Sequence, residues 1–494
     1  MNTQQLSVRA IRNAAIIFAQ RRTRGGGGSR SALRRRLRHG VKGAVIRNMS
    51  TLPVLLLMFL GTSSPSRAAR LLDVLFEWKD IEYAFPNHHA KDVLIKTRAY
   101  IPGNSIAIDV DAWEQGNGDN QVFVTIPRFK PGVPASLATI VLGKDGSPKL
   151  LPYPDWSWHR EGNCEGITSV FRTQIDQCGR LWVLDSGMVE VLGNIKRICQ
   201  PQVLVFNLKN NKLLLRYRIP DSVLMQHSIL TTIVTDVLDV TGSCREAFAY
   251  ITDVSGFGLI VVDAHREKSW RVVSNYFYPY PLHGHFELNN EHFELMDGVL
   301  SLAISPNLNS RGDKMLYFHS LASVRESWVS TSVLRNESNF KDGINRVPEM
   351  FYVSQGTRPG QAAASAMDGE GAAVFFSVLP KNSLNCWNPR LPYNDENIVE
   401  IDRDDVTFQF ASGLKIIQDR KGKEWVWALT SRFQNVMVGK MDPENINYRV
   451  LRAPVEELVK GTSCAAQRSQ SFISVSQTIT EHSRNSGYVP FIFP

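Results

Sequence analysis

The hydrophobic positions of this chain, from about residue 71 onward, fall in short runs rather than in the 3.6-residue period of helices. These runs are rich in Val, Ile, Phe, Tyr and Trp, and clusters of Gly, Asp, Asn and Pro separate them. β-Branched and aromatic residues fit pleated strands, whereas Gly, Asn, Asp and Pro favour turns. The pattern therefore predicts an all-β fold.

One unit of this pattern, a polar turn followed by an aromatic-rich strand, occurs six times at separations of 51 to 68 residues. The copies are DAWEQGNGDNQVFVTIP, DQCGRLWVLD, TGSCREAFAYITD, NSRGDKMLYFHS, DGEGAAVFFSVL and DRKGKEWVWALTS, around Phe123, Trp182, Ala249, Tyr317, Phe375 and Val426. An apolar strand precedes each copy, such as SIAIDV before the first. A repeated unit of three or four antiparallel strands is typical of a propeller blade. The six copies predict a six-bladed β-propeller over residues 71–465.

A propeller also has to close its ring. The strand-like segment Trp78 to Phe85 lies outside the six copies. We expect this N-terminal strand to pair with residues near Tyr448 to Ala453 and complete the last blade. The Ser-, Gln- and Thr-rich residues 466–494 are predicted to form a flexible tail.

Several motifs, taken in order along the chain, resemble those of the insect yellow / major royal jelly protein family. They are WKDIEYAFP from Trp78, VTIPRFKPGVPASL from Val124, PYPDW from Pro152, NCEGITSV from Asn163, DQCGRLWVLDSG from Asp176, DGV from Asp297 and CWN from Cys386. The resemblance covers roughly residues 75–465 in consistent order. It implies a secreted six-bladed propeller, in agreement with the repeat count.

The resemblance also implies a function in cuticle pigmentation and the melanin pathway. Some family members convert dopachrome, others bind biogenic amines, and others are abundant secreted nutrients, so the family indicates the fold better than the chemistry. We expect a protein that binds catechol, indole or biogenic amine ligands at the propeller channel. A dopachrome-converting isomerase and a structural or nutrient protein are the alternatives.

Charge is unevenly distributed along the chain. Residues 1–70 contain thirteen Arg and one Lys but no Asp or Glu, whereas the whole chain has a net charge of +9. The remainder therefore carries a net charge of −5, and it offers no case for nucleic-acid binding.

The basic leader contains an apolar run of nine residues, Leu52 to Leu60, followed by the small residues of Ser66-Arg-Ala-Ala69. This order is typical of a secretory signal, and the run is too short to span a bilayer. We predict a signal peptide over residues 49–68, an extracellular location and no membrane span. Residues 1–48 are then a disordered or untranslated basic extension before an initiator at Met49. An Arg-rich organellar transit segment is the alternative.

The cysteines fit an oxidising compartment, because all six follow this leader and their number is even. They are Cys164, Cys178, Cys199, Cys244, Cys386 and Cys464, and no CxxC motif occurs among them. Six cysteines allow fifteen disulfide connectivities, and the sequence does not select one. One glycosylation sequon lies in the body of the chain, at Asn336.

Two loops combine aromatic rings with polar groups and are the candidate ligand-binding segments. One contains Asp155 and Trp156, and the other contains Asn385, Trp387 and Asn388. Aromatic faces attract cations and flat rings, while Asp or Asn holds polar substituents. We assign these five residues to a small aromatic ligand at the channel mouth. The alternative is that the Trp residues pack between blades and that Cys386 only fixes its loop through a disulfide.

Three further motifs have ordinary structural explanations. Asp185-Ser186 ends a strand in a turn, and no GxSxG motif occurs in the chain. Arg311-Gly-Asp313 occupies a turn that needs Gly and Asp anyway. The stretch His283 to His292 holds three imidazoles and two carboxylates but lacks HExxH spacing, so we expect no metal and no cofactor.

Dopachrome conversion requires an acid and a base on either side of a planar ring. Asp155, His159 and Asp185 are chemically able to fill these roles. The sequence does not show that they converge, so no catalytic pair is assigned.

Overall fold

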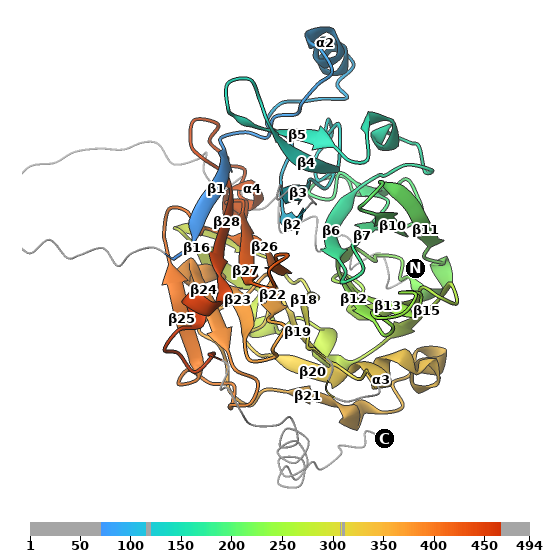
Figure 1. The fold of residues 1–494 in the computed structure, drawn as a ribbon, viewed down its shortest axis with the longest axis vertical. Helices are drawn as coiled ribbons and strands as arrows, with labels where there is room; N and C mark the ends of the chain where they lie inside the picture. The colour runs from blue at the N-terminus through green and yellow to red at the C-terminus, as the bar shows by residue number, and fades with distance from the viewer. Residues whose placement is uncertain (1–70, 115–119, 307, 309–311, 466–494) are drawn as a thin grey trace, which may run out of the picture. The chain divides into compact units, whose positions relative to one another are not determined.

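The computed structural model describes residues 71–114, 120–306, 308 and 312–465, which belong to one compact unit. The predictions for residues 1–48, 49–68 and 466–494 lie outside the described residues. Six four-stranded antiparallel sheets surround a centre, with β2, β6, β12, β18, β22 and β26 innermost (Figure 1). Each innermost strand contacts the next around the whole ring. The six-bladed β-propeller predicted from the repeats is therefore confirmed.

The blades are numbered in chain order, and their strands run from the inside outward. The first is β2 (Asp109–Glu114), β3 (Asn120–Thr125), β4 (Leu137–Leu142), β5 (Pro148–Pro152); the second is β6 (Val170–Ile175), β7 (Arg180–Asp185), β10 (Gln202–Asn207), β11 (Lys212–Arg218); the third is β12 (Leu230–Val237), β13 (Ala247–Asp253), β14 (Gly258–Asp263), β15 (Lys268–Val272). The fourth is β18 (Val299–Ile304), β19 (Met315–Ser320), β20 (Ser327–Ser330), β21 (Phe351–Val353); the fifth is β22 (Ser365–Met367), β23 (Val374–Val378), β24 (Ser383–Trp387), β25 (Ile398–Arg403); the sixth is β26 (Ala411–Gln418), β27 (Glu424–Thr430), β28 (Tyr448–Pro454), β1 (Asp73–Trp78).

Two hairpins and a few short helices decorate the ring. The hairpins are β8 (Met188–Val189) with β9 (Lys196–Arg197), and β16 (His285–Leu288) with β17 (Glu291–Glu294). The α-helices are α2 (His88–Lys96), α3 (Thr331–Arg335), α4 (Phe433–Met437) and α5 (Val455–Val459). The 3₁₀ turns are η1 (Trp156–His159), η2 (Asp221–Val223), η3 (Asn275–Phe277), η4 (Pro281–His283), η5 (Glu337–Gly343), η6 (Pro348–Met350) and η7 (Leu379–Lys381). None of the helices in the described part of the chain is long and apolar enough to cross a membrane.

The aromatic-rich strand of every sequence repeat is the second strand of a blade. The middle positions of these strands are mostly apolar because neighbouring blades cover both of their faces. In β7, Leu181 and Val183 pack against the first blade, whereas Trp182 and Leu184 pack against the third. The described core accordingly contains one hydrophobic cluster at each of the six blade interfaces.

The first innermost strand is displaced from its predicted place. The pattern indicates a strand over residues 105–110, whereas β2 spans Asp109–Glu114. Ile106 and Ile108 are buried beside the strand without belonging to it. Their apolar character reflects burial and not strand structure. An apolar run looks the same in a buried strand and in a buried segment without secondary structure, so the pattern could not distinguish the two.

An N-terminal strand closes the ring, as predicted, but its residues differ from the predicted ones. The closing strand is β1, which pairs antiparallel with β28 from Asp73 opposite Arg452 to Trp78 opposite Tyr448. The prediction of Trp78 to Phe85 was wrong in its bounds. The chain turns at Asp80, whose carboxylate accepts hydrogen bonds from the backbone N–H groups of Ile81 and Gly103. Residues beyond the turn pack against the first blade instead.

All six cysteines are paired, which resolves the connectivity that the sequence left open. Cys178–Cys244 joins the second blade to the third, and Cys164–Cys199 lies within the second blade. Cys386–Cys464 ties the end of the described chain to the fifth blade.

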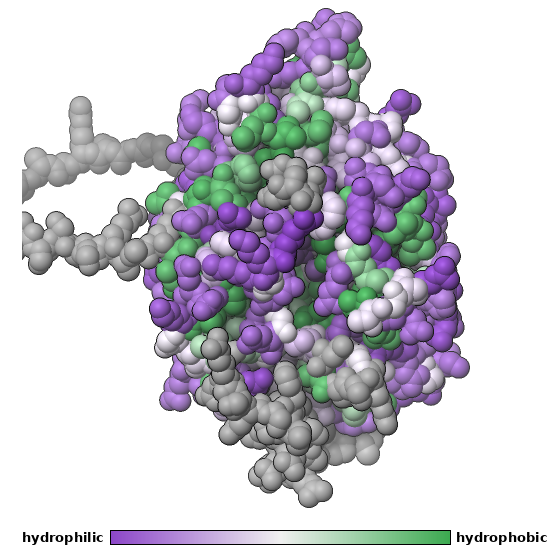
Figure 2. Space-filling model, in the orientation of Figure 1, coloured by the Kyte–Doolittle hydropathy of each residue, from purple (hydrophilic) through white to green (hydrophobic). Residues whose placement is uncertain are grey.

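Figure 2 shows hydrophobic groups scattered among hydrophilic ones on the face in view, with the largest gathering near β1 and β5.

Candidate functional site

The first predicted ligand loop forms η1 at the rim of the first blade. Asp155 caps this turn, because its carboxylate accepts hydrogen bonds from the backbone N–H and the hydroxyl of Ser157 at 2.7 and 2.5 Å. Trp156 is half-buried and stacks on Phe85, with ring centroids 5.2 Å apart. Its buried indole N–H has no hydrogen-bond partner within the described residues. Both side chains have structural roles here, and their contact with a ligand stays a prediction.

His159, at the end of the same turn, is a core residue. Its Nε2 lies 2.9 Å from the carbonyl oxygen of Tyr153, and its Nδ1 accepts a hydrogen bond from the backbone N–H of Ser136 at 3.3 Å. These partners assign the proton to Nε2. Burial lowers the pKa of the imidazole to about 3. His159 is therefore neutral at physiological pH and too weak a base for proton abstraction.

Trp387 of the second predicted loop is buried in β24, the third strand of its blade. Its ring meets Tyr393 at 5.0 Å and Tyr317 of the neighbouring blade at 5.8 Å, in both cases edge to face. Its indole N–H donates to the carbonyl oxygen of Leu391 at 3.0 Å. Trp387 therefore packs between two blades, which was the alternative that the sequence left open.

The two asparagines beside Trp387 also make internal hydrogen bonds. The side-chain oxygen of Asn385 accepts from the hydroxyl of Ser383 at 2.7 Å, and the amide of Asn388 donates to the carbonyl oxygen of Ser463 at 3.0 Å. Asn388 thus secures the segment that precedes Cys464. A ligand contact by either residue stays a prediction.

Asp185 holds its own turn, as expected. Its buried carboxylate accepts hydrogen bonds from the backbone N–H groups of Thr168 and Ser169 at 2.8 and 2.7 Å. In the described chain, no hydrogen bond joins any two of Asp155, His159 and Asp185. Each of the three candidate acid and base groups thus makes hydrogen bonds with a different part of the structure.

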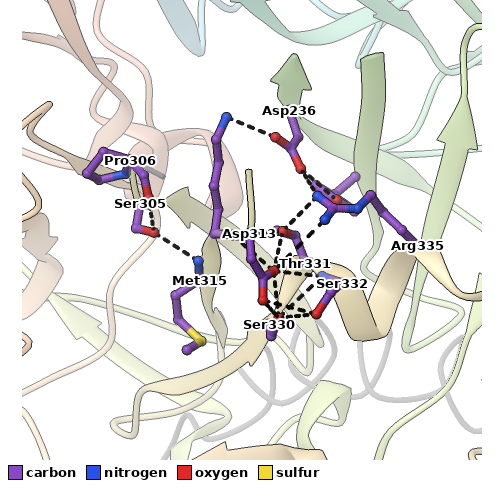
Figure 3. A network of polar contacts seen from close by, with 11 residues as sticks. Asp236, Ser305, Pro306, Asp313, Met315, Ser330, Thr331, Ser332 and Arg335 are labelled. Carbon is purple, nitrogen blue, oxygen red and sulfur yellow. Dashed lines mark hydrogen bonds and ion pairs between the residues drawn. The ribbon is translucent and has the colours of Figure 1, made fainter. Parts of the chain in front are cut away.

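Asp313, from the Arg-Gly-Asp motif, belongs to a buried polar network shown in Figure 3. Its carboxylate accepts hydrogen bonds from the hydroxyl of Ser330 at 2.8 Å and from the backbone N–H of Ser332 at 3.0 Å, at the start of α3. Beside it, Asp236 pairs with Lys314 at 2.8 Å and with Arg335 at 2.7 Å. Asp236 lies on β12, so the network joins the third blade to the fourth. Asp313 is a structural residue.

The central channel contains a cavity of about 100 Å³, which is lined by the innermost strands of all six blades. Its polar lining comprises Asp109, Arg172, Gln174, Thr232, Ser301, Ser365 and Lys415. Its apolar lining includes Val234, Ala303, Ile304, Ala366, Met367, Leu414 and Ile416. None of the five predicted ligand residues is among them. The cavity is smaller than the apolar cavity of about 150 Å³ that holds benzene, so an aromatic ring would enter it only if lining side chains moved.

Arg172 crosses this channel. It extends from β6 and donates to the hydroxyl of Thr232 at 2.8 Å and to the carbonyl oxygen of Ser412 at 2.7 Å. Ser412 belongs to β26, in a blade that is not adjacent to that of Arg172. Burial lowers the pKa of the guanidinium from its usual value, and nearby Asp109 opposes that effect. The side chain therefore braces three innermost strands and narrows the channel.

Carboxylates of β2 hold the neighbouring strand β6. Asp109 accepts from the backbone N–H of Thr173 at 3.2 Å, and Asp111 accepts from that of Ile175 at 2.9 Å. Lys415 of β26 lies 3.3 Å from the Asp109 carboxylate and donates to the carbonyl oxygen of Thr173 at 2.6 Å. Burial raises the pKa of Asp111 to about 6, against the opposing effect of Lys415. The wall of the channel thus carries both acidic and basic groups.

An apolar cluster lies near the starts of the innermost strands β18 and β26. It contains Phe286 and Leu288 of β16, packed with Leu300, Leu379 and Phe410 from the blades. At the ends of the innermost strands the lining is mixed, because Ile304 and Met367 end β18 and β22, whereas the polar Gln174 is next to the end of β6. The lining of the channel thus combines charged, polar and apolar side chains, a combination suited to a small ring with polar substituents.

Sequence reasoning missed these channel residues, although a signal was present. Asp109, Arg172 and Lys415 are charged residues of innermost strands, and all three are buried. A charged residue within a strand that is buried on both faces requires a special partner or a cavity. The aromatic loops drew attention instead because ring content, rather than position in the blade, was the criterion.

Comparison with known proteins gives a consistent result. A family profile described as "Major royal jelly protein" matches residues 168–464. The chain is 32% identical over 428 residues to "Protein yellow" of Drosophila madeirensis, covering 86% of this chain and 72% of that protein. It is 32% identical over 415 residues to "Protein yellow" of Drosophila melanogaster, covering 83% and 74%. These matches extend over most of the propeller.

Solved structures give only a weak likeness. Virginiamycin B lyase from Staphylococcus aureus is 11% identical, with a TM-score of 0.35, over 71% of this chain and 95% of that one. A similarity of this size supports no argument about function.

Proposed function

Because the chain belongs to the major royal jelly protein family, we propose that it is a secreted protein of cuticle pigmentation that binds catechol, indole or biogenic amine ligands in its central channel. The relatives named "Protein yellow" support the pigmentation role. Three disulfides support secretion, because such bonds persist in oxidising compartments.

The observation that carries the binding proposal is the mixed polar and apolar lining of the central channel. Its lining offers the carboxylate of Asp109 and the amide of Gln174 for hydroxyl or amino substituents, and it offers apolar contact from Ile304 and Met367. A ligand ring would rest in the apolar part and direct its polar substituents inward.

A dopachrome-converting isomerase is the second candidate, and the charged channel wall favours it. Conversion moves a proton away from a carbon next to an electron-poor centre, so it needs a base and a group that stabilises developing negative charge. Asp109 is a carboxylate in the same wall as the cations Arg172 and Lys415. These residues have the chemistry for both roles.

The test is to incubate the purified protein with dopachrome and with dopamine, following absorbance decay and the heat of binding. Gln174→Leu changes the channel wall, whereas Trp387→Phe changes the predicted loop and serves as the matched variant. Weaker binding only in Gln174→Leu supports the channel. Weaker binding only in Trp387→Phe contradicts it and favours the loop. Turnover above the spontaneous rate selects the isomerase, and neither binding nor turnover selects a structural role.

A further inference from the structure

The hairpin β16–β17 presents a regular pattern of imidazoles and carboxylates on its outer face. Its register places His285 opposite Glu294 and Glu287 opposite His292. All four side chains are exposed, whereas Phe286 and Leu288 on the other face are buried. Each histidine therefore has a carboxylate directly across the hairpin, and the two histidines lie on one diagonal.

The two imidazoles are already close and nearly parallel. Their ring centroids are 5.8 Å apart and their planes are inclined by 24°. With metal–nitrogen bonds of about 2.0 Å, two neighbouring imidazole ligands have centroids roughly 5 Å apart. In this stacked arrangement the ring nitrogens do not converge, so His285 and His292 would have to turn about their side-chain torsions to bind one ion, which their exposure permits. Nδ1 of His285 also lies 2.8 Å from Oε1 of Glu294. A carboxylate on the second ring nitrogen is the usual support of a metal-binding histidine.

The hairpin that carries these residues is held firmly in place. Its tip is a two-residue turn whose Asn289 exchanges reciprocal amide hydrogen bonds with Asn382 of the fifth blade. Gln361 donates to the carbonyl oxygen of His285 at 2.9 Å, and Lys440 pairs with Glu291 at 2.7 Å. Rigid support reduces the entropy lost when side chains converge on an ion.

The geometry points to a binding site for a divalent transition metal of the imidazole-preferring kind, such as Cu²⁺ or Zn²⁺, formed by His285 and His292 with Glu294 as the orienting carboxylate. Across the described residues, no three His, Cys, Asp or Glu side chains are already arranged around one point. The remaining ligand positions are therefore filled by water or by a rotated Glu287. Cu²⁺ binds most tightly, because nitrogen sites follow the Irving–Williams order. A bound ion links the two strands of the hairpin.

The test uses the full purified chain and Cu²⁺ as the probe, with calorimetry for affinity and electron paramagnetic resonance for the number of coordinating nitrogens. His285→Ala and His292→Ala should each weaken binding at least tenfold and remove one nitrogen from the spectrum. Glu294→Gln should weaken binding about tenfold while both nitrogens remain. His265→Ala, an exposed histidine on the third blade, is the matched control and should bind as the parent chain does.

The side chains to be replaced are exposed, so unchanged thermal unfolding without metal checks that the variants fold. Cu²⁺ binding that persists at parental affinity in the His285→Ala, His292→Ala double variant would overturn the site. So would a spectrum with a single nitrogen in the parent chain. Both results leave the proposed channel ligand unaffected, because no residue of this hairpin face lines the channel.

Discussion

The guanidinium of Arg172 donates to the carbonyl oxygen of Ser412 at 2.7 Å and thereby joins the second blade to the sixth across the channel. A propeller leaves the centre of its ring without backbone pairing, because each innermost strand pairs only outward within its own blade. Here buried charged side chains supply the missing links. The residues that define the channel are therefore also residues that hold the ring together.

Replacing Arg172 with Met should lower the free energy of unfolding by about 2 to 4 kcal/mol, because buried partners lose a charged donor. Denaturant unfolding measures the change. Arg160→Met, at an exposed position, is the control and should change stability by less than about 0.5 kcal/mol. Equal effects of the two substitutions would contradict the bracing role of Arg172.

Replacing Trp387 with Ala should destabilise the protein by about 3 to 5 kcal/mol, because the ring fills the interface between the fourth and fifth blades. Trp387→Phe should recover part of this loss. Leu214→Ala changes a half-exposed side chain and serves as the control in the same unfolding assay. If Trp387→Ala unfolded like the parent chain, the packing role would be wrong.

The pKa of Asp111 predicts a defined pH dependence. Burial raises it to about 6, above the value of about 3.8 in an unfolded chain. The folded state therefore binds the extra proton between these values, and this carboxyl makes stability fall as pH rises from about 4 to 6. Asp111→Asn should abolish that fall and gain up to about 3 kcal/mol at pH 7 relative to the parent.

Urea unfolding at pH 4, 5, 6 and 7 checks the Asp111 prediction. Asp395→Asn, an exposed position, is the control and should follow the parental curve. An Asp111→Asn curve parallel to that of the parent chain would show that the carboxyl titrates alike in both states.

Removing the Cys386–Cys464 disulfide should cost about 4 kcal/mol, because it closes a loop of 78 residues. The double variant Cys386→Ser, Cys464→Ser should therefore show a lower thermal midpoint than the parent chain. When a reductant is added to both proteins, their thermal midpoints should become equal. A midpoint unchanged in the absence of reductant would show that the anchor of the C-terminal segment does not limit stability.

Asn336 is expected to carry a glycan when the chain is secreted by eukaryotic cells. Its side chain is exposed at the end of α3, and its oxygen accepts a hydrogen bond from the hydroxyl of Ser338 at 2.7 Å. Treatment with an amidase that removes N-glycans should increase gel mobility, and Ser338→Ala should abolish this shift. Asn210→Gln, outside any sequon, should leave it intact. A shift that survives Ser338→Ala would place the glycan elsewhere.

The sequence by itself determined the architecture, because strand patterning and turn chemistry are local properties that repeat in every blade. The alternation in Leu181, Trp182, Val183 and Leu184 records two buried faces, and it needs no knowledge of which blade lies on either side. The count of six and the need for a closing strand follow from such patterns. The bounds of that strand did not, because the turn at Asp80 depends on Gly103, a residue distant in sequence.

Tertiary structure alone decided which residues line the central channel. Asp109, Arg172 and Lys415 are separated by 63 and 243 residues along the chain, and only ring closure brings them around one cavity. The aromatic loops around Trp156 and Trp387 have the composition of a ligand site, but the third and fourth strand positions in a blade lie away from the axis. The same holds for the disulfide pairs and for the diagonal of His285 and His292: each depends on strand register and blade order, which are fixed by packing between distant segments rather than by any local run of residues.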